Sequence, residues 1–149
     1  MKDKRLAMTT RNVTFEKLAV QRIIITDAHV VYEPSVYGGD GNEPRKNIVL
    51  SISPTEEAFI QELETEIDPK KLNSAVKDGT VKCKMTMETV HVFDSAKTLI
   101  EHPQKWRGCL INAVILMRGK WSSKTQSGLS LEVVDVQILD TAVVAQCPF

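Results

Sequence analysis

Long apolar runs are missing from this chain. No stretch of about 18 consecutive apolar residues occurs, which excludes a transmembrane helix. The start, MKDKRLAMTTRN, also lacks the apolar segment of a secretory signal. Cysteine is scarce: Cys83, Cys109 and Cys147 are an odd number at wide spacing, which disfavours a disulfide framework. Together these absences predict a cytoplasmic protein with free thiols and no membrane partner.

Catalytic motifs are missing too. Residues 38–41 (GGDG) lack the Lys-Ser or Lys-Thr of a phosphate-binding loop and predict a flexible loop instead. The chain has no Cys-x-x-Cys, and no two of its three histidines are four residues apart. We therefore expect no enzymatic activity, no metal and no cofactor. Two metal sites would require folding to gather distant residues: Cys83, His91 and Cys109 for zinc, or Asp94, Asp135 and Asp140 for magnesium.

The chain has no net charge, with 19 basic and 19 acidic residues, and this excludes a general polycation. Its charges are nevertheless segregated. Residues 81–124 hold eight basic and three acidic residues, whereas residues 54–68 hold six acidic residues and no basic one. Segregation of this kind determines where an anion can bind even on a neutral protein.

Hydrophobic residues make up 42% of the chain and charged residues 26%, which is typical of one soluble globular domain. β-branched residues and alternating patterns predict strands in five segments: 19–32, 45–53, 81–93, 108–118 and 129–139. A helix should begin at Ser53-Pro54-Thr55, with a serine or threonine cap and Glu56 and Glu57 in its first turn. Shorter helical turns are expected within residues 70–77 and 94–103.

The predicted strands are long, and their alternation changes phase near Thr89 and at Val133-Val134. Such phase changes indicate β-bulges, which bend a sheet. The expected fold is therefore mainly β: a five-stranded OB-like barrel with a helix inserted between strands two and three. A β-sandwich is the alternative. The expected organisation is a flexible N-terminal arm over 1–14, the OB-like domain over 15–140 and a C-terminal tail over 141–149.

The segment between the last two predicted strands, 119–128, reads GKWSSKTQSG and carries no acidic residue. It predicts the tip of a long β-hairpin. Proteins that bind single-stranded nucleic acid without sequence preference need cations along the phosphates and flat rings under the bases. Both residue types alternate in this part of the chain, first in Lys105-Trp106-Arg107 and again in Arg118-x-Lys120-Trp121. Core packing is the alternative for each tryptophan, since this residue is mostly buried in globular proteins.

The candidate binding residues are basic or aromatic, and they come from the predicted strands, the hairpin and the glycine-rich loop. Lys82 and Lys84 alternate with apolar residues, which puts them on the polar face of a strand. The full set is Tyr32, Tyr37, Arg45, Lys46, Lys82, Lys84, Lys105, Trp106, Arg107, Arg118, Lys120, Trp121 and Lys124.

The order of these segments resembles phage single-stranded DNA-binding proteins of the T7 type. The resemblance rests on a strand that begins at Gly108, a polar connector, and a strand ending in Val134-Asp135-Val136-Gln137-Ile138-Leu139. It also rests on a second strand that runs into Ser53-Pro54-Thr55-Glu56-Glu57, and it spans residues 13–140. The resemblance implies an OB-fold that binds single-stranded DNA in replication or recombination, in the host cytoplasm if the chain is phage-encoded.

The chain end departs from that family. Such proteins often end in a long acidic tail with a terminal aromatic residue, which recruits replication partners. This chain ends TAVVAQCPF, keeps Pro148-Phe149 and has only Asp140 nearby. Packing of this end on the barrel and self-association into a homo-oligomer are both open, as is recruitment of replication or recombination proteins. The alternative function is a protein-interaction or structural β-barrel module that does not bind nucleic acid.

Overall fold

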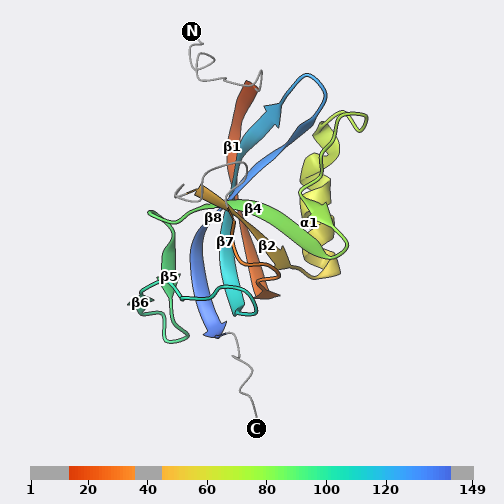
Figure 1. The fold of residues 1–149 in the computed structure, drawn as a ribbon. Coiled ribbons are helices and arrows are strands. Elements are labelled where there is room, and N and C mark those ends of the chain that lie inside the picture. Colours follow the sequence, from red (N-terminus) through yellow and green to blue (C-terminus); the bar gives the residue numbers. More distant parts are fainter. Residues whose placement is uncertain (1–13, 36–44, 142–149) are drawn as a thin grey trace.

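The computed structural model describes residues 14–35 and 45–141, and in these residues the fold is mainly β (Figure 1). The long strands fall close to where alternation predicted them, except that a turn at 87–89 divides the predicted strand 81–93 in two. The helix lies between the second and third long strands, as expected. The elements are β1 (Thr14–His29), β2 (Arg45–Ser51), α1 (Pro54–Leu63), the 3-10 turn η2 (Glu64–Glu66), β3 (Val76–Lys77), β4 (Thr80–Thr86), β5 (His91–Phe93), β6 (Leu99–Ile100), β7 (Leu110–Ser122) and β8 (Ser127–Asp140).

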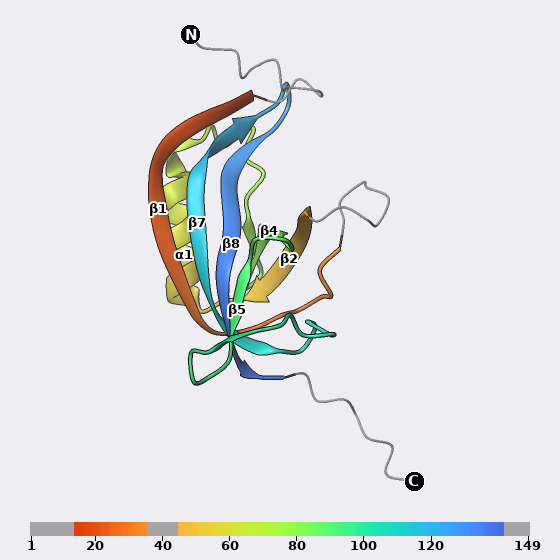
Figure 2. The same cartoon turned by 90° about the vertical axis from the view of Figure 1, so that its left-hand side faces the viewer.

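The sheet follows the strand order β1-β7-β8-β4-β2, with β3 on β4 and the β5–β6 pair beside β8. Figure 2 shows β1, β7 and β8 side by side, bending along their length. The β7–β8 register shifts between Val114 and Ile115, where Val134 of β8 is skipped. This bulge confirms the phase change predicted at Val133-Val134. The change predicted near Thr89 falls in the turn between β4 and β5.

The five-stranded barrel is not confirmed. The described residues form an open sheet of eight strands: five long strands lie on the path β1-β7-β8-β4-β2, and the short strands β3, β5 and β6 pair beside it. A bridge between Val30 and Leu50, and another between Ser35 and Asn47, link the chain after β1 to β2. No helix forms within 70–77 or 94–103, contrary to the prediction: these segments are turns and irregular chain, with β3 at the end of the first and β6 within the second. The predicted arm and tail lie, apart from Thr14 and Thr141, outside the described residues.

Alternating side chains of the long strands form the core. In β4, Val81, Cys83 and Met85 are buried, while Lys82 and Lys84 between them are exposed, as the alternation predicted. In β7, every second residue from Ile111 to Met117 is buried in the same way. One face of the sheet therefore packs inward, and the other carries the polar and basic side chains.

Helix α1 begins with a capping box. The side chain of Ser53 accepts a hydrogen bond from the N–H of Glu56, and the Glu56 carboxylate accepts one from the N–H of Ser53. This satisfies two backbone donors that a helix start leaves without partners. The other carboxylate oxygen of Glu56 accepts from the N–H of Thr26 in β1 (3.0 Å). The predicted cap is thus confirmed at Ser53, and it also ties the helix to the sheet.

The buried carboxylate of Glu64 connects the end of α1 to the chain before β3. It is 2% exposed and accepts hydrogen bonds from Ser74 Oγ (2.6 Å) and from the N–H of Ala75 (2.8 Å). Glu64→Ala removes both acceptors, and we expect it to lower the free energy of unfolding by about 1–3 kcal/mol. Urea unfolding measures this loss. The exposed Glu62 on the same helix is the control, and an equal loss in Glu62→Ala would contradict the role given to Glu64.

Candidate nucleic-acid interface

A groove of about 440 Å³ opens on the polar face of the sheet. Its walls come from β2, β4, the loop before β3 and the β7–β8 hairpin, four segments that are distant in the sequence. Of the side chains that the structure describes around this groove, none is an aspartate or a glutamate. The lining residues are Asn47, Asn73, Ser74, Ala75, Lys82, Cys83, Lys84, Trp121, Ser123, Gln126, Leu129 and Leu131.

Trp121 lies on the groove with its indole ring over Gly128, the residue directly opposite it on β8. A Cβ atom at position 128 would be 2.8 Å from Trp121 Nε1 and 2.9 Å from the carbonyl oxygen of Asn73. Because such contacts are too close, only glycine at position 128 leaves room for the indole ring. The ring is half-buried, so part of its surface remains open to the groove.

The hairpin that carries Trp121 is held by the loop before β3. The N–H of Asn73 donates to the carbonyl of Ser127 (2.7 Å), and the N–H of Ser127 donates to the carbonyl of Lys71 (2.9 Å). The hairpin tip itself is closed by Ser123, whose side chain accepts from the N–H of Gln126. Both strands extend further than predicted, so Lys120 and Trp121 are in β7 and the tip is 123–126.

Two lysines of β4 supply the positive charge of the groove. Lys84 is directly opposite Asn47 of β2 and Glu132 of β8. Partial burial, and secondarily the positive charge of Arg45, lower the pKa of Lys84, while Glu132 opposes them by raising it. Burial and Arg45 both disfavour the ammonium form, so an anion bound beside Lys84 would offset their effect.

Glu132 is the acidic residue nearest to these lysines in the strand register, and its carboxylate has other partners. Its Oε1 accepts from Arg118 Nε at 2.8 Å, and its Oε2 accepts from the hydroxyl of Thr86 at 3.3 Å. Arg118, predicted as a DNA contact, therefore forms an ion pair within the sheet. This pair offsets the one negative charge that lies next to Lys84 on β8.

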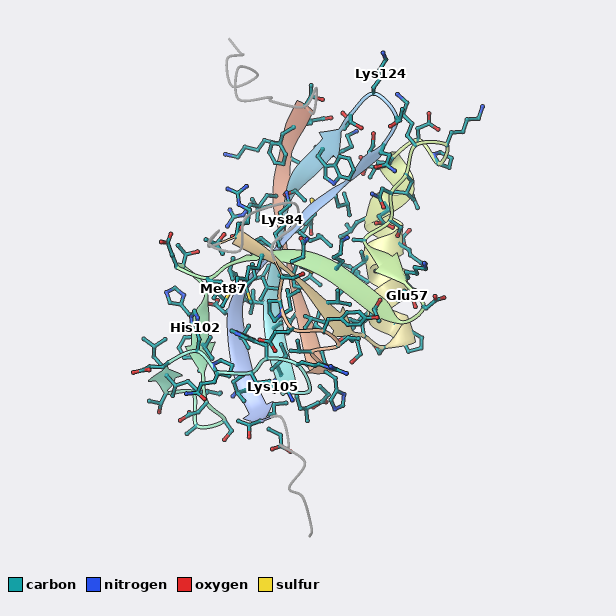
Figure 3. All side chains as sticks on the ribbon, in the orientation of Figure 1. Glu57, Lys84, Met87, His102, Lys105 and Lys124 are labelled. Carbon is teal, nitrogen blue, oxygen red and sulfur yellow. The ribbon has the colours of Figure 1, made fainter. Side chains whose placement is uncertain are left out.

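The other predicted cations are not among the residues that line the groove. Figure 3 shows Lys124 at the hairpin tip and Lys105 at the opposite end of the sheet. Arg107 follows Lys105 two residues later, and the backbone N–H of Arg107 donates to the Glu33 carboxylate (3.0 Å). Lys120 forms an ion pair with Glu16 (3.3 Å), and strand alternation places it on the face opposite Trp121.

Trp106 is a core residue and not an exposed stacking ring. It is 3% exposed, its ring meets His102 edge-on at 5.9 Å, and its backbone N–H donates to the Glu33 carboxylate. The ring therefore has no open face for a base. This outcome corrects the binding role predicted for Trp106 and matches the core alternative.

The remaining candidates are spread around β2. Arg45 is exposed and Lys46 is half-buried at the start of this strand, opposite Thr86 and Met85. Tyr32 is 62% exposed in the segment between β1 and β2. Tyr37 lies outside the described residues.

Sequence patterns missed the uncharged polar residues of the groove. Asn47, Asn73, Ser123 and Gln126 line it together with the lysines and Trp121. They come from a strand, a loop and the hairpin tip, and none belongs to a motif. Their amide and hydroxyl groups can donate and accept hydrogen bonds, which suits both phosphates and base edges.

Metal-ligating groups and thiols are the other candidates for chemistry in the part of the chain that the structure describes. Within residues 14–35 and 45–141, histidine, cysteine, aspartate and glutamate side chains form no group of three or more that could hold a metal ion. The thiols of Cys83 and Cys109 are free and buried, as predicted, and Cys147 lies outside these ranges. Burial raises the pKa of the Cys83 thiol to about 12, so this thiol stays protonated. No helix in the described ranges is long and apolar enough to cross a membrane.

Comparison with known proteins gives matches at the level of structure. No family model matches the sequence, and no curated protein matches it. The single-stranded DNA-binding protein of bacteriophage Enc34, solved in complex with single-stranded DNA, matches with a TM-score of 0.59 and 16% identity, over 84% of this chain and 89% of that one. The single-stranded DNA-binding protein gp2.5 of bacteriophage T7 matches with a TM-score of 0.51 and 17% identity, over 87% and 97%. The resemblance predicted from the sequence is confirmed: the chain has the fold of phage single-stranded DNA-binding proteins.

Proposed function

We propose that this protein binds single-stranded DNA without strong sequence preference and serves phage-type replication or recombination. The observation that carries the proposal is the groove beside Trp121, where an indole ring and two lysines meet and none of the described lining residues is acidic. Cations that follow phosphates and rings that stack on bases are the two requirements for this kind of binding. The fold shared with two phage single-stranded DNA-binding proteins supports the same function.

In the proposed mechanism the lysines bind phosphates and the tryptophan stacks on a base. Lys82 and Lys84 are two residues apart on β4, so both face the groove and can neutralise neighbouring phosphates. Trp121 offers its open ring surface to a base. No bond is made or broken in this mechanism, so it requires neither a nucleophile nor a metal.

Titration of the protein with oligo-dT, followed by tryptophan fluorescence, tests the proposal directly. Because Trp106 is buried, quenching should report on Trp121. If two or three phosphates are neutralised, Kd should rise roughly 10-fold between 50 and 200 mM salt. Absence of saturable quenching and of gel retardation at low salt would refute DNA binding and favour a protein-interaction module.

The double variant Lys82→Gln/Lys84→Gln should bind oligo-dT more weakly than the unmodified protein. Removing two phosphate contacts should also reduce the slope of log Kd against log salt by about 1.4. Salt titration of both proteins measures this slope. The matched control is Lys105→Gln/Arg107→Gln: Lys105 lies at the far end of the sheet (Figure 3), and Arg107 is two residues further along the chain. An equal change in slope for the two double variants would show that the groove is not the main phosphate site.

A further inference from the structure

The beginning of β1 lies beside the ring-bearing hairpin. Phe15 is directly opposite Trp121 in the β1–β7 register. Its neighbours hold the strand in place: Thr14 Oγ1 is 2.9 Å from Ser122 Oγ, and Glu16 pairs with Lys120. The position of Phe15 is thus defined by contacts on both sides, although it lies at the start of the described chain.

The ring of Phe15 also packs against a glycine, Gly119 of β7. A Cβ atom at Gly119 would be 2.6 Å from Phe15 Cζ and would clash with the carbonyl oxygen of Glu16. The outer end of the ring, Cζ and Cε1, therefore lies against the backbone of β7, where any side chain at position 119 would displace it. This is the arrangement that Gly128 provides for Trp121 on β8.

The two rings face the same side of the sheet. Directly opposite residues of an antiparallel pair project in the same direction, so Phe15 projects to the side where Trp121 meets the groove. Each ring lies over a glycine, and the strand spacing and rise place these glycines about 8 Å apart. At this separation the two rings would hold two different bases.

The exposure of Phe15 distinguishes it from a core residue. It is 48% exposed, as much as Phe59 on α1, which is 47% exposed. Single exposed apolar residues are common and need no function. Phe15 differs from Phe59 in two respects: its ring packs against Gly119, and it lies opposite Trp121, which lines the groove.

We propose that Phe15 is a second base-stacking residue that extends the interface from Trp121 across β7 onto β1. This inference rests on the proposed DNA binding and adds a site that sequence patterns did not indicate. The ligand it takes is an unpaired base next to the one on Trp121. Its recognition is by ring stacking, so it should tolerate every base.

The test compares Phe15→Leu with the control Phe59→Leu in oligo-dT titrations. We expect Phe15→Leu to raise Kd by roughly 5- to 150-fold, the loss of one stacked base, and Phe59→Leu to leave Kd unchanged. The factor should be the same at both salt concentrations, since stacking releases no counterions. Phe15→Tyr keeps a ring and should keep the affinity.

The outcomes separate this inference from the function on which it rests. If the unmodified protein does not bind oligo-dT, the proposed function fails. If it binds and Phe15→Leu behaves like Phe59→Leu, the function stands and the role of Phe15 is overturned. Equal losses in Phe15→Tyr and Phe15→Leu would also overturn it.

A fluorescence variant tests the same position without relying on a loss of affinity. In Phe15→Trp/Trp121→Phe, the exposed indole is at position 15, and the remaining tryptophan, Trp106, is buried. Oligo-dT should quench this fluorescence in a saturable manner. A variant that binds DNA without any quenching would overturn stacking at position 15.

Discussion

Replacing Trp106 by alanine is expected to lower the free energy of unfolding by about 3–5 kcal/mol, the cost of removing a large side chain from a packed core. The ring is 3% exposed and packs edge-on against His102. A ring of this size leaves a cavity that the neighbouring strands cannot fill. Urea unfolding followed by circular dichroism measures the loss.

The control for this variant is Trp121→Ala, the same substitution in the half-buried ring of the hairpin. Because that ring lies over Gly128 and is open to the groove, its removal should cost about 1 kcal/mol. Equal losses in the two variants would mean that Trp121 belongs to the core as fully as Trp106. Fluorescence of each single-tryptophan protein gives a second measure of burial.

The two tryptophans show what local sequence could not predict. Each is next to a basic residue, so both fitted a pattern of rings between cations. In the fold, each tryptophan residue contacts a residue outside its local pattern. The backbone N–H of Trp106 donates to the carboxylate of Glu33, 73 residues earlier, whereas the ring of Trp121 lies over Gly128 across the hairpin. Neither contact leaves a periodic signal in the sequence.

Strands were predictable because their signal is local. The alternation of Lys82 and Lys84 with buried neighbours placed β4, and the phase change at Val133-Val134 placed a bulge. The segment before β3 was not predictable in this way. Its residues form no helix because Lys71 and Asn73 give their backbone hydrogen bonds to Ser127 of the hairpin, a contact made only after folding.

The groove was predictable in part for the same reason. Its charged and aromatic members, Lys82, Lys84 and Trp121, belong to the residue types that surfaces binding single-stranded nucleic acid combine, cations for phosphates and rings for bases. Its polar members, such as Asn47 and Gln126, are ordinary residues that become neighbours through the curled sheet. The total charge of the chain was uninformative, because the acidic residues of 54–68 cancel it from outside the groove.

Trp121→Ala is expected to raise the Kd for oligo-dT by roughly 5- to 150-fold, the effect of losing one stacked base. The salt dependence of binding should stay the same, since no cation is removed. The double variant Lys82→Gln/Lys84→Gln should show the converse, a reduced slope with the ring intact. Gel retardation at two salt concentrations measures both variants without a fluorescence signal. If Trp121→Ala instead reduced the slope and left low-salt affinity unchanged, the ring would only position the lysines and would not contact a base.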